Sequence, residues 1–184
     1  FQHHRFRDLP RLLSPEDLVV LNNTRVIPAR LYASREGRQE KIEVFLLRCL
    51  EGDVWEALIK PGKKARPGVR LVFEQGRFEA MVVGDSSSAV RQLEFEYSGE
   101  FRDWINQLGE TPLPPYISRP SQPKDRQHYQ TVFARVDGSV AAPTAGLHFT
   151  EPLIQQLPTC QITLHVGYGT FKPVSADDLD EHVM

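Results

Sequence analysis

Short runs of alternating apolar and polar residues fill the chain between residues 29 and 97. The clearest is Leu93–Tyr97, in which apolar side chains occupy every second position, as they do in a strand with one buried face. Residues that favour turns, such as Glu51-Gly52-Asp53, separate neighbouring runs. Six strands within about 70 residues, with no helix between them, favour a small antiparallel barrel or sandwich. The predicted strands are 29–34, 41–48, 54–60, 69–73, 77–83 and 91–97.

The segments on either side of this block have different patterns. Asp17–Leu21 predicts a buried strand. Apolar residues at helical spacing predict an amphipathic helix over 101–108, which begins at Ser98 or Gly99 and ends at Gly109. Closer to the end of the chain, we expect a short helix capped by Thr150 and running through Leu157, and then a strand over 161–166.

The stretch 110–149 has almost no periodicity and is rich in Pro, Gly, Thr and aromatic residues. Such a stretch inside a compact domain is usually functional or disordered, and this one is too apolar for disorder. The change of pattern predicts a β domain inserted into, or appended to, a mixed α/β domain. We assign 30–109 to the β domain with its following helix, and 1–29 and 110–184 to the mixed domain, which we expect to continue beyond Met184.

The composition is that of a soluble globular protein, with 40% hydrophobic and 25% charged residues. The longest apolar runs are too short to cross a bilayer, no secretory signal is visible, and two cysteines suit a reducing cytosol. We therefore expect a cytoplasmic protein, and we expect a monomer. The net charge of −2 argues weakly against nucleic-acid binding through overall charge. The basic run Lys60–Arg70 offers either a local RNA contact or a solvated turn between strands.

Common catalytic and cofactor motifs are missing from the sequence. Gly167-Tyr168-Gly169 lacks the third glycine of a dinucleotide-binding loop. No phosphate-binding loop and no serine nucleophile elbow occurs, and the six histidines do not have the spacing of a metal site. The sequence therefore gives little support to a plain hydrolase or a metalloenzyme, and we expect no metal.

Two polar stretches have the composition of ligand-binding segments. Asn22–Arg30 follows a predicted buried strand, where α/β proteins often bind ligands, and Arg25 could clamp a carboxylate or phosphate. A capped turn with a surface arginine is the alternative. In Leu113–Arg119, consecutive prolines stiffen a loop that carries Tyr116 and Arg119, which suit stacking on a base or sugar. A rigid crossing between domains is the alternative.

Two further stretches place one histidine each among small and apolar residues. Gly138–Phe149 contains Thr144 and His148, and its small residues let the backbone approach a ligand closely. Thr163–Phe171 contains His165, which we expect at the C-terminal end of a strand, with glycines following. Either histidine can be a hydrogen-bonded structural residue instead of a catalyst, and the residues alone leave both interpretations open.

Together these segments resemble the signatures of one family, the S-adenosylmethionine:tRNA ribosyltransferase-isomerases of queuosine synthesis. The resemblance follows the order and spacing of the family across nearly the whole chain. It implies a six-stranded antiparallel barrel inserted into a larger α/β barrel-like domain, a segment before Phe1 and a long segment after Met184. The matching segments are Asn22–Arg30, Leu113–Arg119, Tyr129–Ala134, Val140–Phe149 and Leu164–Pro173.

The resemblance also implies a reaction with S-adenosylmethionine as co-substrate. Its ribosyl part is transferred and isomerised onto 7-aminomethyl-7-deazaguanine at the wobble position of tRNA, which gives epoxyqueuosine and releases adenine and methionine. A base is needed beside the sulfonium; His148 and His165 are both candidates, and Asp125 or a carboxylate in the segment expected after Met184 is the further alternative. The expected substrate-binding residues are Asn22, Asn23, Thr24, Arg25, Tyr116, Arg119, Thr144, Gly146, Gly167, Gly169 and Thr170.

The alternative function is a non-catalytic RNA-binding β-barrel module. Such a binder would carry exposed aromatic residues and lysines on the barrel, whereas the densest motifs here lie outside it. Another S-adenosylmethionine-dependent enzyme, such as a methyltransferase, is a third hypothesis, and only the ribosyl route releases adenine. For the enzyme, we expect one cleft that contains His148, His165, Asn22, Arg25 and Thr144.

Overall fold

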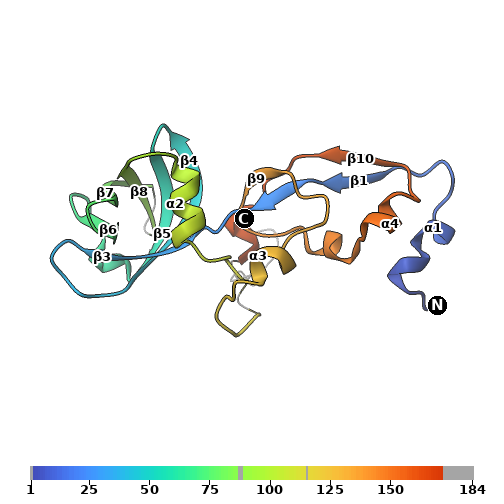
Figure 1. The fold of residues 1–184 in the computed structure, drawn as a ribbon, viewed down its shortest axis with the longest axis horizontal. Helices are drawn as coiled ribbons and strands as arrows, with labels where there is room; N and C mark the ends of the chain where they lie inside the picture. The colour runs from blue at the N-terminus through green and yellow to red at the C-terminus, as the bar shows by residue number, and fades with distance from the viewer. Residues whose placement is uncertain (1, 87–88, 115, 172–184) are drawn as a thin grey trace, which may run out of the picture.

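The computed structural model describes residues 2–86, 89–114 and 116–171. The molecule is elongated, with a closed barrel at one end and two small parallel sheets along the other (Figure 1). The part of the predicted mixed domain beyond residue 171 lies outside the described residues. No helix in the described part of the chain is long and apolar enough to cross a membrane.

The barrel consists of six strands, and every neighbouring pair is antiparallel. Their order around the barrel is β3-β4-β5-β8-β7-β6, and β6 closes the ring against β3. Each predicted strand overlaps one of these strands, so the six-stranded antiparallel barrel is confirmed. The strands are β3 (Arg30–Arg35), β4 (Ile42–Glu51), β5 (Val54–Lys60), β6 (Arg70–Glu74), β7 (Phe78–Asp85) and β8 (Val90–Tyr97).

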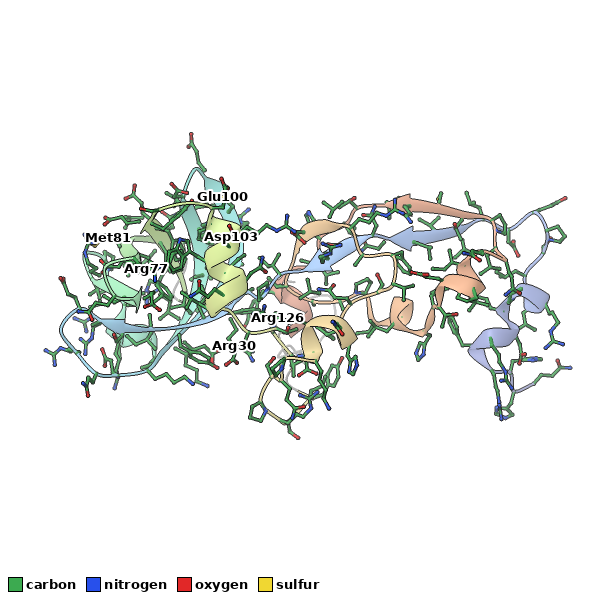
Figure 2. All side chains as sticks on the ribbon, in the orientation of Figure 1. Arg30, Arg77, Met81, Glu100, Asp103 and Arg126 are labelled. Atoms are coloured by element: carbon green, nitrogen blue, oxygen red, sulfur yellow. The ribbon has the colours of Figure 1, made fainter. Side chains whose placement is uncertain are left out.

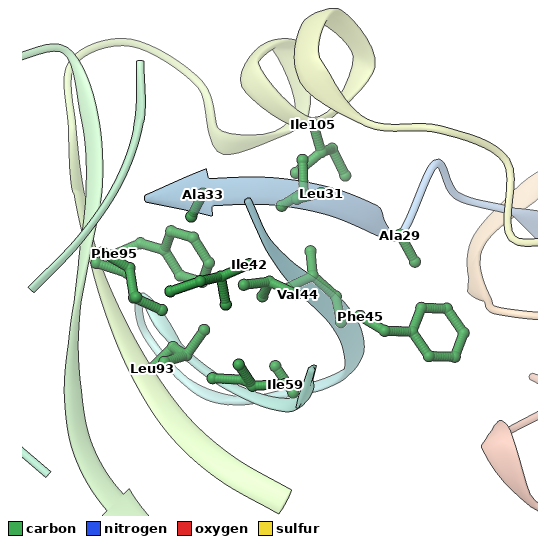
Figure 3. Close-up of a cluster of buried hydrophobic side chains, with 14 of the residues drawn as sticks. Ala29, Leu31, Ala33, Ile42, Val44, Phe45, Ile59, Leu93, Phe95 and Ile105 are labelled. Atoms are coloured by element: carbon green, nitrogen blue, oxygen red, sulfur yellow. The ribbon is translucent and has the colours of Figure 1, made fainter. Parts of the chain in front are cut away.

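Alternate side chains of the six strands fill the barrel and form the main core. Leu31 and Leu93, for example, have no exposed surface, as expected where inward and outward positions alternate. Helix α2 (Phe101–Leu108) covers this core, and Figure 3 shows its Ile105 above Leu31. The ring of Trp104 stacks on Phe78 with 5.4 Å between the ring centres. The helix ends at Gly109 as predicted, but it begins after Glu100 instead of at Ser98 or Gly99.

The chain enters and leaves the barrel along two adjacent segments. Arg30 and Glu110 exchange both backbone hydrogen bonds, at 3.2 and 2.8 Å. A Cβ atom on Gly109 would lie 2.0 Å from the carbonyl oxygen of Pro28, so this close approach requires glycine. Arg126 then donates a hydrogen bond of 2.7 Å to the Gly109 carbonyl, which ties the segment after the barrel to the same junction (Figure 2).

Outside the barrel, two pairs of short parallel strands lie end to end. Strand β1 (Val19–Asn22) pairs with β10 (Thr159–Ile162), and β2 (Thr24–Val26) pairs with β9 (Val136–Ser139). The predicted strand 17–21 corresponds to β1. The predicted strand 161–166 overlaps β10 at its first two residues only, and its extension to 166 was wrong, because β10 ends at Ile162. Strands β2 and β9 were not predicted.

Short helices connect these strands. Thr150 occupies the predicted capping position of the last α-helix, which ends at Ile154 and not at Leu157. The division of the chain into two domains at residues 30 and 109 stays a prediction. The short helices are α1 (Leu9–Leu12), α3 (Asp125–His128), α4 (Glu151–Ile154), and the 3-10 turns η1 (Phe6–Asp8), η2 (Gly62–Lys64), η3 (Thr144–His148) and η4 (Tyr168–Phe171).

Candidate functional site

Residues 163–168, which we call the strap, run from the end of β10 to the barrel without forming a strand. Side chains from β1 and the residue after it replace a strand partner. The Asn22 amide donates to the Leu164 carbonyl at 2.8 Å and accepts from the Leu164 N–H at 3.0 Å. The Thr163 hydroxyl donates to Asn23 Oδ1 at 2.7 Å. Both asparagines, expected as ligand donors, therefore hold the strap in place, Asn22 through the backbone of Leu164 and Asn23 through the side chain of Thr163.

Ser139, at the end of β9, holds the strap from its other side. This serine has no exposed surface. Its hydroxyl accepts a hydrogen bond of 2.9 Å from the Val166 N–H and donates one of 2.7 Å to the Ala141 carbonyl. The Val140 N–H donates to the Val166 carbonyl at 3.1 Å. The strap is thus fixed on two sides, although it belongs to no sheet.

His165 lies in the middle of the strap, beyond the strand in which it was predicted. Its Nδ1 is 2.7 Å from the hydroxyl oxygen of Thr24, and Thr24 is only 1% exposed. The imidazole lies directly on Gly138, where a Cβ atom would come within 2.7 Å of the ring. His165 as a whole is exposed. The result is an oriented imidazole, bonded at one nitrogen to a buried hydroxyl and accessible from outside.

A pocket of about 650 Å³ lies where the barrel meets the strap and the loop 113–119. The ring of Tyr168, at the end of the strap, packs edge-on against Phe45 of β4 with 5.9 Å between ring centres. The guanidinium of Arg30, on the neighbouring strand β3, lies 5.8 Å from the centre of the same Phe45 ring. The lining residues are Arg30, Glu43, Phe45, Leu58, Ile59, Lys60, Gly62, Ala89, Leu113, Pro114, Ile117, Arg119 and Tyr168.

Charges of both signs line this pocket. Arg30 Nε lies 3.6 Å from a carboxylate oxygen of Glu43, too far for a hydrogen bond. It is a buried polar atom with no hydrogen-bond partner among the described residues. Lys60 adds a second cation to the same wall. The pocket can therefore receive a ligand with an aromatic part and at least one hydrogen-bond acceptor.

The loop 113–119 forms one wall, and a buried carboxylate fixes its end. Arg119 donates two hydrogen bonds of 2.7 Å to Asp125, and the Gln122 N–H donates a third of 2.7 Å. The hydrogen bonds from Arg119 hold the pKa of Asp125 well below the usual range of aspartate. A carboxylate this acidic is a poor proton acceptor at neutral pH, which argues against Asp125 as the base.

The family model described as "Queuosine biosynthesis protein" matches residues 1–184. The chain belongs to this family. The S-adenosylmethionine:tRNA ribosyltransferase-isomerase of Symbiobacterium thermophilum is 50% identical over 188 residues, which cover 100% of this chain and 54% of that protein. The protein of the same name from Acetivibrio thermocellus is 48% identical over 99% of this chain and 54% of its own length.

The chain spans about half the length of these curated relatives of the queuosine biosynthesis family. A crystal structure of S-adenosylmethionine tRNA ribosyltransferase from Thermotoga maritima aligns with 90% of this chain and 46% of that chain. That alignment has 29% sequence identity and a TM-score of 0.38.

In this member of the queuosine biosynthesis family, Arg25 projects to the opposite face of β2 from Thr24. The strand alternates buried and half-buried positions, so neighbouring side chains face opposite ways. Arg25 donates to the Ala134 carbonyl at 2.9 Å and lies 3.8 Å from Asp137, which also pairs with Arg102. A separate hollow of about 270 Å³ lies there. The structure therefore does not bring Arg25 to the face that carries His165.

His148 lies in a third place. Its ring packs against Phe6, with 5.3 Å between ring centres, and it lines a hollow formed otherwise by residues of the N-terminal segment. Thr144 is exposed at the start of η3. Gly146 is closely packed, because a Cβ atom there would come within 2.9 Å of the Thr131 side chain. A common cleft for His148 and His165 stays a prediction.

The remaining predicted residues belong to the loop 113–119, to the end of the strap and to the residues just after it. Tyr116 is 74% exposed and is not part of the pocket lining. Gly167 and Gly169 flank Tyr168, whereas the side chain of Thr170 lies outside the described part. Within the described residues, no group of three or more His, Cys, Asp or Glu side chains is placed to hold a metal ion.

Sequence reasoning missed several residues that build this site. Arg30 ends the first family segment, and Tyr168 lies between two glycines of the last one, yet neither was singled out. Phe45 belongs to the barrel pattern and carries no separate signal. Gly138 and Ser139 begin the third stretch, and the small size of these two residues was the available signal, since both lie under the strap.

Proposed function

We propose that the protein is an S-adenosylmethionine:tRNA ribosyltransferase-isomerase. It transfers and isomerises the ribosyl part of S-adenosylmethionine onto 7-aminomethyl-7-deazaguanine at the wobble position of tRNA, forms epoxyqueuosine, and releases adenine and methionine. The observation that carries this proposal is the family match over residues 1–184. We further propose that the protein works without a metal, as a monomer in the cytoplasm.

The convergence of the family segments on one place supports a site for this reaction beside the barrel. The segment Asn22–Arg30 supplies Arg30 to the pocket, the loop 113–119 forms one wall, and the strap supplies Tyr168. Thr24 and His165, from the same two segments, form a hydrogen-bonded pair outside the pocket lining. A volume of about 650 Å³ falls within the range of roughly 300–1,000 Å³ that is usual for small-molecule sites. We propose that S-adenosylmethionine binds in this pocket.

The tRNA is proposed to contact the outer face of the same wall. Tyr116 is exposed on the loop and suits stacking on an RNA base, and Lys60 suits a phosphate or the methionine carboxylate. Arg119 already donates two hydrogen bonds to Asp125, so a contact with substrate would have to use its remaining N–H groups. The further proposed contacts are Asn22, Asn23, Arg25, Thr144, Gly146, Gly167, Gly169 and Thr170, with His148 and His165 as the catalytic candidates.

The rival RNA-binding barrel module receives no support from the surface of the barrel. Among the described residues, the exposed large aromatic side chains are Phe6 and Tyr116, and both lie outside the barrel strands. A barrel that stacks single-stranded bases needs exposed rings on its own strands.

The test is adenine release from S-adenosylmethionine by the full-length protein, with tRNA that carries the precursor base. Ile117→Trp adds bulk to a pocket wall and should raise the KM for S-adenosylmethionine by at least about tenfold. Val132→Trp, at a position 50% exposed and away from the pocket lining, is the matched control and should behave as wild type. If wild-type protein releases no adenine, the function is wrong. If it does and Ile117→Trp is unaffected, the pocket assignment is wrong.

A further inference from the structure

The hydroxyl of Thr24 is a buried hydrogen-bond donor with one available acceptor. Thr24 is 1% exposed, so water does not reach the hydroxyl. Within the described residues, its Oγ1 has one hydrogen-bond partner, His165 Nδ1, at 2.7 Å. A buried hydroxyl that donates to nothing is costly and rare in folded proteins. The Thr24 O–H therefore donates to His165 Nδ1.

This direction decides where the proton of the neutral imidazole lies. A ring nitrogen that accepts a hydrogen bond carries no hydrogen, so the proton is on the other nitrogen, Nε2. If Nδ1–H donated to Thr24 instead, the buried O–H of Thr24 would be left without an acceptor. That loss corresponds to roughly a 5- to 150-fold preference for the Nε2–H form.

We propose that His165 acts in the reaction as a neutral hydrogen-bond donor through Nε2–H, with Thr24 as the residue that positions it. The proposal rests on the proposed function. An imidazole with its proton on Nε2 cannot also accept a proton there. The base that removes the proton from the ribose carbon beside the sulfonium is therefore a different group.

The surroundings of His165 suit a fixed donor. The ring packs directly on the backbone of Gly138, where any Cβ atom would collide with it. The φ of +144° at Gly138 also favours glycine. Asn22 holds the strap residue before the histidine, and Ser139 holds the residue after it. A preorganised donor stabilises charge that develops on a substrate without having to move during the reaction.

His165 does not itself line the proposed substrate pocket, but it lies close to the pocket along the chain. Tyr168 follows His165 by three residues, and three residues of extended chain span at most about 11 Å. The strand face that carries Thr24 also carries Val26, which packs with Leu113 of the pocket wall. The ligand class is thus an acceptor on the nucleoside. We assign it to a ring nitrogen of adenine, which gains the electron pair of the bond to ribose as that bond breaks.

The first test reads the proton position directly by ¹⁵N NMR of the imidazoles in histidine-labelled full-length protein, at a pH well above the usual range of histidine titration. We expect His165 to show a protonated Nε2 and an unprotonated Nδ1. Thr24→Ser should keep this pattern, and Thr24→Val should lose it or mix the two forms. A protonated Nδ1 in the wild-type protein would overturn the proposal.

The second test separates a donor from a base by adenine release. The side-chain amide of glutamine can donate from nearly the position of Nε2, but it cannot accept a proton as a base does. His165→Ala should lower kcat by about 10²–10³-fold, and His165→Gln should recover at least tenfold of that loss. Equal activity of the Gln and Ala variants, with both folded, would refute the donor role.

The positioning role is tested at Thr24 and Gly138. Thr24→Val should lower kcat with little change in KM, and Thr24→Ser should restore it. Gly138→Ala should reduce kcat beyond its effect on melting, whereas Gly37→Ala, at a glycine with φ of +70° and open space around its Cβ, should leave kcat unchanged. If wild-type protein releases no adenine, the proposed function fails, and the NMR result still decides the proton position.

Discussion

Replacing Ser139 with alanine tests whether one buried hydroxyl holds the strap. The hydroxyl accepts from the Val166 N–H at 2.9 Å and donates to the Ala141 carbonyl at 2.7 Å. In the alanine variant the Val166 N–H loses its acceptor, which costs about 1–3 kcal/mol, and the bond to Ala141 loses a net contribution of about 0.5–1.5 kcal/mol. Because Val166 is only half-buried and water can reach it in part, we expect a total loss of about 2 kcal/mol.

Chemical denaturation with urea measures this free energy of unfolding, and a thermal scan provides a check. For a chain of this length, 2 kcal/mol corresponds to a fall in Tm of about 4–8 °C. Hydrogen exchange adds the local readout, because the amides of Val166 and Val140 should exchange faster once the strap is released. Exchange in the barrel strands should change only as much as global stability does.

Ser98→Ala is the matched control, since Ser98 is exposed and no side-chain hydrogen bond of it is seen in the described structure. Its stability should stay within about 0.5 kcal/mol of wild type. The reasoning is refuted if Ser139→Ala also changes stability by less than about 0.5 kcal/mol while the Val166 amide stays equally protected. The strap would then depend on its other anchors, and Ser139 would only fill space.

Two carboxylates that are paired with cations should stay ionised at unusually low pH, because both have lowered pKa values. Hydrogen bonds from Arg35 and then Lys64 lower the pKa of Glu40 to about 2; because the folded value lies below the unfolded one, its stabilising effect is complete above about pH 4.5 and is lost as the pH falls towards 2. Glu40→Gln should therefore flatten the acid limb of a stability–pH curve measured by urea denaturation, and an unchanged limb would contradict the pairing. Asp125, whose pKa Arg119 lowers further, should stay ionised at about pH 3 in a ¹³C titration; protonation near pH 4 would show that the pair is not formed.

The barrel could be predicted from the sequence because its signals are local. Alternation with period two marks each strand, and glycine-containing turns separate strands that pair antiparallel with near neighbours. Strands β2 and β9 could not be predicted in this way, because they are three and four residues long and pair in parallel across more than a hundred residues. Such short strands exist through their tertiary partners and leave no periodic pattern.

The strap was taken for the end of a strand for a related reason. Polar and apolar residues alternate from Thr163 to Val166 as in a strand, but the partner of the Leu164 N–H is the Asn22 side chain and not another backbone. Residue types indicated which segments carry polar side chains, and Thr24 and His165 from two of them contact each other. They did not reveal which polar side chains hold the fold and which face outward, because both kinds occur side by side in the same segment.

That mixture has a physical origin in the strap itself. A chain that crosses a junction without a sheet partner still has N–H and C=O groups that must be paired. Asn22 and Ser139 supply those partners, so their side chains are occupied by the backbone and not by a ligand, and the side chain of Asn23 is occupied by the Thr163 hydroxyl. His165 and Arg30 differ from these residues. The imidazole of His165 is held in place but exposed, and Arg30 has a buried Nε with no hydrogen bond among the described residues. Side chains such as these two still have a hydrogen-bonding group free for a ligand.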